Sequence, residues 1–221
     1  MNLLTRRGTI PGPAGELAIA LDTPQLPDGQ PTRGLALLCH PHPVHGGTMD
    51  NKVVQTLARA FVALGWRVLR FNFRGVGGSA GQWDGGRGEI DDALAALAAH
   101  RQPGEPLVLG GFSFGGYVAS QVAARLPADQ RAQRVVLIAP ATGNFDVAPV
   151  PAGSLVVHGD ADDVVPLQAT LDWARPQVQP VVVVPGVGHF FHGQLPLLKA
   201  IVVDAFGGTP PASAAPEQPH S

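Results

Sequence analysis

The stretch that decides the fold reads Leu107-Val-Leu-Gly-Gly-Phe-Ser113-Phe-Gly-Gly116. An apolar run of strand length leads into the pattern G-x-S-x-G, and helical spacing follows from about residue 114 to residue 125. Such a strand-turn-helix needs glycine two residues before and two after the serine, because a Cβ there would clash with neighbouring backbone. The turn would hold the Ser113 hydroxyl clear of the sheet, at the positive end of the helix. Ser113 is therefore a candidate nucleophile, with an ordinary glycine-rich turn and an incidental serine as the alternative.

Strand and helix patterns alternate on both sides of this stretch. We expect strands at 34–39, 67–73, 107–110, 134–139, 154–158 and 178–184, with helices between them and near 167–174 and 193–206. Residues 6–10 and 16–21 flank a Pro-Gly-Pro-Ala-Gly turn and predict an antiparallel hairpin at the start. The sequence thus predicts an α/β fold with a mostly parallel sheet and helices on both faces. We expect one domain over residues 1–206 and a disordered tail over 207–221.

The composition excludes several classes of protein. In the 221 residues, 45% are hydrophobic, 14% are charged and the formal net charge is −2. These values exclude a disordered chain and argue against a nucleic-acid partner, since no basic excess exists to neutralise phosphates. Cys39 is the single cysteine, so no disulfide forms within the chain. We find no secretory leader and no membrane-length apolar run, and therefore expect a cytoplasmic protein without a membrane partner.

A base and an acid follow the serine in chain order. The apolar run 155–157 ends in His158-Gly-Asp160-Ala-Asp162-Asp163, and the run 181–184 is followed by Gly186-Val-Gly-His189-Phe-Phe. Catalytic groups gather at the carboxyl ends of parallel strands, and a serine hydroxyl needs a histidine base oriented by a carboxylate. The order serine, acid, histidine, with each residue after its own strand, predicts a catalytic set of Ser113, His189 and one of the three aspartates.

An oxyanion hole needs two backbone amides beside the nucleophile. The Phe114 amide opens the helix after Ser113 and is the first candidate. The second is expected in the loop Cys39-His-Pro-His-Pro-Val-His-Gly-Gly47. Within residues 40–43 of this loop the two prolines have no N–H, so only the amides of His40 and His42 can donate. We choose His42, which lies between the two prolines.

Aromatic residues next to the catalytic positions are candidates for substrate contact. Phe112, Phe114, Phe190 and Phe191 all neighbour Ser113 or His189, and we assign Phe112 and Phe191 to substrate binding. A place in the core is the alternative for Phe112 and Phe190.

Two further patterns point to cofactors. His40, His42 and His45 form H-x-H-x-x-H, but no carboxylate of the kind that metallohydrolases use stands nearby. The glycines around residue 77 fit a loose dinucleotide fingerprint, yet no helix begins there to hold a pyrophosphate. We expect neither a metal nor another cofactor.

The acid loop carries a family resemblance. The arrangement H-G-x-x-D-x-x-V-P, at residues 158 to 166, is similar to the acid loop of the α/β-hydrolase superfamily, and this similarity favours Asp162 over its neighbours. The segments 40–43, 46–52 and 70–77 resemble a bacterial subgroup of small esterase-like hydrolases near the dienelactone hydrolases, which use cysteine where Ser113 stands. The resemblance covers nearly the whole chain apart from the tail.

The resemblance implies an enzyme with an open site. Many members of the superfamily insert a helical cap where this chain has only residues 141–153. We therefore expect a cap-less serine esterase that cleaves small-molecule esters with short or projecting acyl groups through Ser113, Asp162 and His189. The alternatives are a thioesterase or acyltransferase with the same triad, and a hydrolase-fold binding protein without catalysis.

Overall fold

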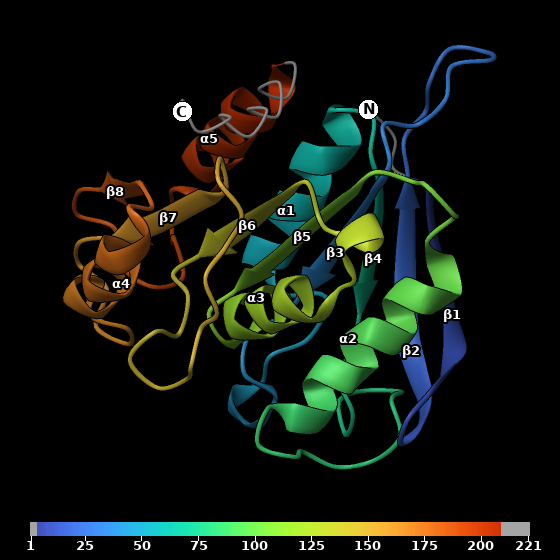
Figure 1. Cartoon of the computed structure of the whole chain (residues 1–221), viewed down its shortest axis with the longest axis horizontal. Helices are drawn as coiled ribbons and strands as arrows, with labels where there is room; N and C mark the ends of the chain where they lie inside the picture. The colour runs from blue at the N-terminus through green and yellow to red at the C-terminus, as the bar shows by residue number, and fades with distance from the viewer. Residues whose placement is uncertain (1–3, 209–221) are drawn as a thin grey trace, which may run out of the picture.

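The computed structural model describes residues 4–208, which contain one eight-stranded sheet in the order β1-β2-β4-β3-β5-β6-β7-β8 (Figure 1). The strands are β1 (Leu4–Gly12), β2 (Gly15–Thr23), β3 (Leu35–Cys39), β4 (Arg67–Phe71), β5 (Leu107–Phe112), β6 (Arg134–Ile138), β7 (Leu155–Gly159) and β8 (Val181–Val184). The hairpin β1–β2 joins β4 in antiparallel fashion, and β3 to β8 are parallel. The predicted fold class is confirmed.

Helices cover both faces of the sheet because the central strands are apolar on both sides. The helices are α1 (Lys52–Ala63), α2 (Arg87–His100), α3 (Phe114–Arg125), α4 (Leu167–Ala174) and α5 (Leu195–Gly207). In β3, Leu35 and Leu37 pack toward α2 and α3, whereas Ala36 and Leu38 pack toward α1 and α5. Alternating side chains thus supply two hydrophobic cores, one on each face. Within residues 4–208, no helix has the length and apolar character that crossing a membrane requires.

Two strands are shorter than expected by more than one residue, each for a local reason. The strand expected at 67–73 ends at Phe71, because the Phe73 amide donates to the ring of His40. The strand expected at 178–184 begins at Val181, because Val178 takes a left-handed backbone conformation with φ 52°. The expected tail lies outside the described residues from position 209 onward.

The carboxyl ends of the parallel strands meet at one end of the sheet, toward the bottom and lower left of Figure 1. The loops that follow β3, β5, β7 and β8 come together there. Between β6 and β7 the chain forms no helix and no strand, so the absence of a cap domain at this place is confirmed. The β6–β7 connection therefore adds no cap domain over the end of the sheet that carries the candidate residues.

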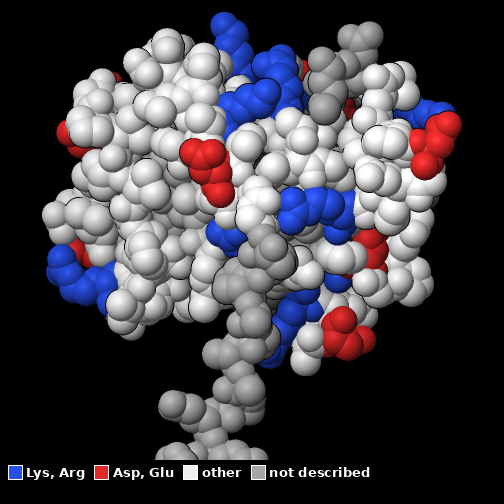
Figure 2. Space-filling model, turned by 90° about the horizontal axis from the view of Figure 1, so that it is seen from above, with Lys and Arg blue, Asp and Glu red and all other residues white. Residues whose placement is uncertain are grey.

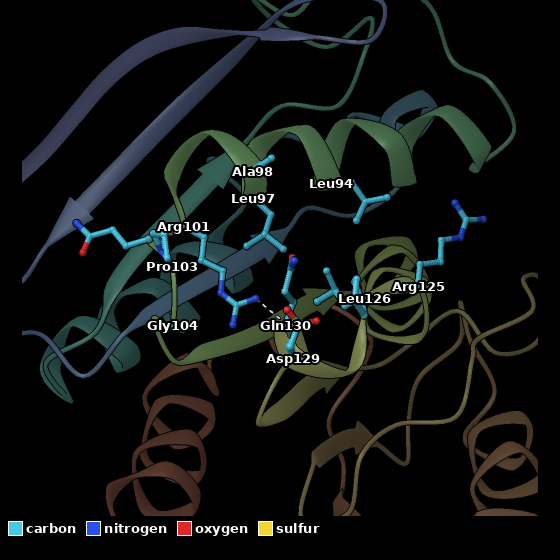
Figure 3. A pocket seen from close by; sticks show the side chains of 12 residues that line it. Leu94, Leu97, Ala98, Arg101, Pro103, Gly104, Arg125, Leu126, Asp129 and Gln130 are labelled. Carbon is cyan, nitrogen blue, oxygen red and sulfur yellow. Dashed lines mark hydrogen bonds between the residues drawn. The ribbon is translucent and has the colours of Figure 1, made fainter.

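At the opposite end of the sheet, where the parallel strands begin, arginine side chains donate hydrogen bonds to backbone carbonyls. Arg33 donates to the Phe206 carbonyl, and Arg101 donates to the carbonyls of Glu105 and Gln130. Figure 2 looks onto this end, with Lys and Arg side chains across its middle. A cavity of about 580 Å³ lies between the last turns of α2 and α3 and is lined by Leu94, Leu97, Leu126 and Arg101 among others (Figure 3). This cavity is at the far end of the sheet from Ser113.

Candidate active site

Ser113 occupies the tight turn between β5 and α3. Its backbone has φ 56° and ψ −120°, a combination that a residue with a side chain keeps only when the surrounding structure enforces it. A Cβ at Gly111 would overlap the Gly115 carbonyl, and a Cβ at Gly115 would overlap the Cys39 carbonyl. Both glycines are thus required by the close approach of backbone. The Ser113 side chain caps no amide of α3 and the residue is 8% exposed, which leaves the hydroxyl available to a ligand.

Asp162 and His189, from the loops after β7 and β8, form a hydrogen bond. His189 Nδ1 lies 2.7 Å from Asp162 Oδ2, and both side chains are buried. An ionised carboxylate can only accept, so Nδ1 carries the proton and Nε2 keeps a free lone pair. This is the tautomer that a histidine base requires.

Four donors surround the Asp162 carboxylate. Its Oδ1 accepts the amides of Val164 at 2.9 Å and Val165 at 2.8 Å, while His158 Nε2 lies 3.2 Å from Oδ2. Burial alone would raise the pKa of Asp162, but the hydrogen bonds from His158, His189 and the Val165 amide outweigh burial and hold this pKa well below its ordinary value. Asp162 is therefore a carboxylate at neutral pH.

The structure distinguishes the three aspartates of this loop. Asp160 and Asp163 are exposed, and Asp160 accepts the Gly186 amide. Asp162 is the aspartate of this loop that bonds to His189.

Phe112 connects His189 with the serine turn. Its ring packs on the His189 ring with 4.8 Å between centroids, and Phe112 directly precedes Ser113. Within residues 4–208, no hydrogen bond joins Ser113 Oγ to the imidazole, whose bonded partner is Asp162. Such bonds are often long in an unliganded enzyme and shorten when substrate binds. The three candidate residues thus stand at one end of the sheet, with the histidine already oriented.

The ring of His40 holds the loop after β3 in place through two hydrogen bonds to the backbone. His40 is fully buried, its Nδ1 donates to the Pro41 carbonyl at 2.7 Å, and its Nε2 accepts the Phe73 amide at 3.1 Å. Burial lowers the pKa of His40 to about 4, against an opposing contribution from the Pro41 carbonyl. The ring is therefore neutral at physiological pH, as its two hydrogen bonds require.

The two amides expected in the oxyanion hole carry no competing bond. Within residues 4–208, neither the Phe114 amide nor the His42 amide donates to a protein acceptor. The His42 ring packs on Phe114 at 5.2 Å and on Trp83 at 4.5 Å between centroids. These ring contacts hold the loop after β3 against the first turn of α3.

Phe112 and Phe191 are corrected from substrate residues to core residues. They are 0% and 1% exposed and belong to the core beneath α1 and α5, so neither ring offers a surface to a ligand. The chain turns at Phe191, where φ is 52°, and its ring is directed inward. Phe190 is instead 46% exposed and packs on the His189 ring at 5.1 Å.

The histidine cluster of the loop after β3 is not assembled for a metal. His40 uses both ring nitrogens in hydrogen bonds to the protein. In the part of the chain that the structure describes, no three His, Cys, Asp or Glu side chains gather as metal ligands would. His42 and His45 pack ring to ring at 4.7 Å.

Two site neighbours were not expected from the sequence. His158 precedes Asp162 by four residues at the end of β7, and this spacing was the signal that could have identified it. Trp83 lies in the loop before α2, and its contact with His42 depends on how distant segments pack. No local pattern around Trp83 indicates that contact.

Comparison with known proteins places this geometry in a family. A family model described as "Serine aminopeptidase, S33" matches residues 42–153. The chain is 39% identical to the protein RP471 of Rickettsia prowazekii over 145 residues, which are 61% of this chain and 59% of RP471. The matched part of the chain thus spans less than two thirds of that curated relative.

Solved structures extend the similarity over most of the chain. XC6422 from Xanthomonas campestris, described as an α/β serine hydrolase without lid, shares 42% identity with a TM-score of 0.81, covering 91% of this chain and 93% of that one. An α/β serine hydrolase homologue from Coxiella burnetii shares 38% identity with a TM-score of 0.79, covering 91% and 97%. The protein therefore belongs to the α/β-hydrolase superfamily, among the serine hydrolases without a lid.

Proposed function

We propose that the protein hydrolyses carboxylic esters through an acyl-enzyme formed on Ser113. The observation that carries the proposal is the 2.7 Å hydrogen bond from His189 Nδ1 to Asp162, which leaves Nε2 as a free base at the end of the sheet where Ser113 stands. A serine hydroxyl attacks an ester only when such a base removes its proton. The enforced backbone of Ser113 and the unengaged amide of Phe114 support the same chemistry.

Each step uses groups of this chain. His189 Nε2 takes the Ser113 proton while Oγ bonds to the ester carbonyl carbon. The amides of Phe114 and His42 donate to the oxyanion of the tetrahedral intermediate. The intermediate collapses, the carbon–alkoxy bond breaks, and the alcohol leaves with the proton from His189. Water then attacks the acyl carbon as His189 Nε2 takes its proton; the second tetrahedral intermediate collapses, the bond from the acyl carbon to Ser113 Oγ breaks, Oγ regains a proton from His189, and the acid leaves, so the steps need no cofactor.

The open end of the sheet favours small-molecule esters with short or projecting acyl groups. No cap domain encloses a ligand between β6 and β7. Phe190, which is 46% exposed beside His189, is the aromatic ring that we place against the substrate in place of Phe112 and Phe191.

The test is labelling with a fluorophosphonate, read by intact mass, together with hydrolysis of p-nitrophenyl acetate and butyrate. We expect one adduct on the wild type and none on Ser113→Ala. Ser154→Ala is the matched control, because Ser154 is also 8% exposed but stands before β7. That variant should keep both the adduct and the esterase activity.

Other substrates separate the remaining alternatives. Aminoacyl p-nitroanilides test for a peptidase, and an acyl thioester tests for a thioesterase. Cleavage of either compound without ester hydrolysis would replace the esterase proposal. A wild type that takes no adduct and cleaves none of the substrates would favour a binding protein with the same fold.

A further inference from the structure

His158 is a buried titratable side chain for which the mechanism above has no use. It lies at the end of β7 and is 0% exposed. Its Nε2 is 2.9 Å from the Val165 carbonyl oxygen and 3.2 Å from Asp162 Oδ2. That carboxylate oxygen is the one bonded to His189. Two imidazoles therefore meet at one oxygen of Asp162.

The surroundings of His158 determine its protonation. The Val165 carbonyl can only accept a hydrogen bond, so Nε2 carries a proton. His158 Nδ1 is buried and has no hydrogen-bond partner among residues 4–208. A proton on Nδ1 would be a buried donor without an acceptor, which costs free energy. The Nε2–H of His158 therefore faces two acceptors, the Val165 carbonyl in a hydrogen bond and Asp162 Oδ2 in a longer contact of 3.2 Å.

Val165 closes this arrangement into a ring. Its amide donates to Asp162 Oδ1 at 2.8 Å, and its carbonyl accepts His158 Nε2 at 2.9 Å. The imidazole, the Val165 backbone and the carboxylate thereby constrain one another. The ionisable side chains in contact with Asp162 are His158 and His189, while Asp160 and Asp163 of the same loop are exposed to solvent.

We propose that His158 is a positioning residue, whose shared N–H fixes the Asp162 carboxylate and weakens Oδ2 as an acceptor for His189. This inference rests on the proposed function. A carboxylate that loses a donor holds a protonated imidazole more strongly. Without the His158 N–H, His189 should stay protonated to a higher pH, so that the enzyme becomes active only at a higher pH than the wild type.

The experiment compares His158→Leu, which removes the donor, with His158→Gln, whose amide restores an N–H. Fluorophosphonate titration first normalises each preparation to its active fraction. We expect the acid limb of the kcat/KM profile to move up by about 0.5 pH units in the leucine variant, or about threefold in the ionisation constant, as for part of a charge-assisted hydrogen bond. In the glutamine variant, the acid limb of the kcat/KM profile should lie at the same pH as in the wild type.

A purely structural role gives a different result. It lowers stability and active fraction in the leucine variant but leaves the acid limb where it was, and an unmoved limb overturns the proposal. A limb displaced equally in both variants also overturns it, because the restored N–H then has no effect.

A readout independent of activity separates this inference from the proposed function. The downfield proton resonance of His189 Nδ1–H should move further downfield in His158→Leu and return in His158→Gln. If the wild type proves inactive, the esterase proposal fails, and this resonance still decides the role of His158. A resonance at one position in all three proteins overturns the inference.

Discussion

Replacing His40 with glutamine should remove a defined part of the pH dependence of stability. His40 is fully buried, and burial lowers its pKa to about 4 from the ordinary 6.5. Because the folded-state value is the lower one, the unfolded chain binds more protons below pH 6.5. The stability that depends on the neutral ring is complete above pH 6.5 and is lost as the pH falls toward 4.

The size of the loss follows from the two pKa values. Linkage between a pKa of 6.5 in the unfolded chain and about 4 in the folded one gives roughly 2 kcal/mol of unfolding free energy lost between pH 7.5 and pH 5. Glutamine does not titrate, and its amide oxygen can still accept the Phe73 amide. The wild type should therefore lose roughly 2 kcal/mol more than His40→Gln over this interval, whatever their difference at pH 7.5.

Denaturant unfolding followed by tryptophan fluorescence measures this difference, since the chain has three tryptophans. Curves for both proteins at pH 7.5 and pH 5 give four unfolding free energies, and the double difference cancels every other titrating group. Equal losses in the two proteins would refute the reasoning, because they would mean that the His40 ring titrates alike in the folded and unfolded chains.

Three further substitutions have expected outcomes. Asp162→Asn should lower kcat for ester hydrolysis by about 10³-fold or more at pH 7.5 without a large change in melting temperature, because the amide no longer enforces the His189 tautomer. Gly115→Ala should lower the unfolding free energy by about 1–3 kcal/mol, since its Cβ meets a strand carbonyl, whereas Gly143→Ala, with only an ordinary contact, should change it little in the same denaturant assay. Asp22→Asn should cost about 3 kcal/mol in unfolding experiments, because the buried Arg70 guanidinium then keeps only Asp50, which is 40% exposed and lies 3.2 Å away, as an ionic partner; a neutral result would show that Asp50 alone is sufficient.

The fold followed from patterns that are local along the chain. Strands such as Leu35–Cys39 are apolar throughout because they are buried on both faces, and a run of this length between turn residues is visible in the sequence. The glycine at 111 was predictable because its steric overlap with the Gly115 carbonyl lies within the tight turn around Ser113, whereas Gly115 is required by its approach to the Cys39 carbonyl at the end of β3.

The side chains around the candidate site were less predictable, because their environment depends on segments distant in sequence. Phe190 and Phe191 are adjacent and chemically identical, yet one is 46% exposed and the other 1%. The backbone turn at Phe191, where φ is 52°, determines which of the two rings is buried, and the residue types alone do not indicate this turn. His158 and His189 likewise both contact Asp162, but through Nε2 in one ring and Nδ1 in the other, and the sequence does not indicate which nitrogen faces the carboxylate.

The connection between β6 and β7 contains no helix and no strand, and this bears on the fate of the proposed acyl-enzyme. An enclosed site must open before product leaves, and that motion often limits turnover. Without a cap domain, bulk water should reach the acyl group of the proposed acyl-enzyme. Water at its bulk concentration should then outcompete a dissolved alcohol or amine as the acceptor. Turnover should accordingly depend little on solvent viscosity, and transfer to added nucleophiles should be a minor path beside hydrolysis.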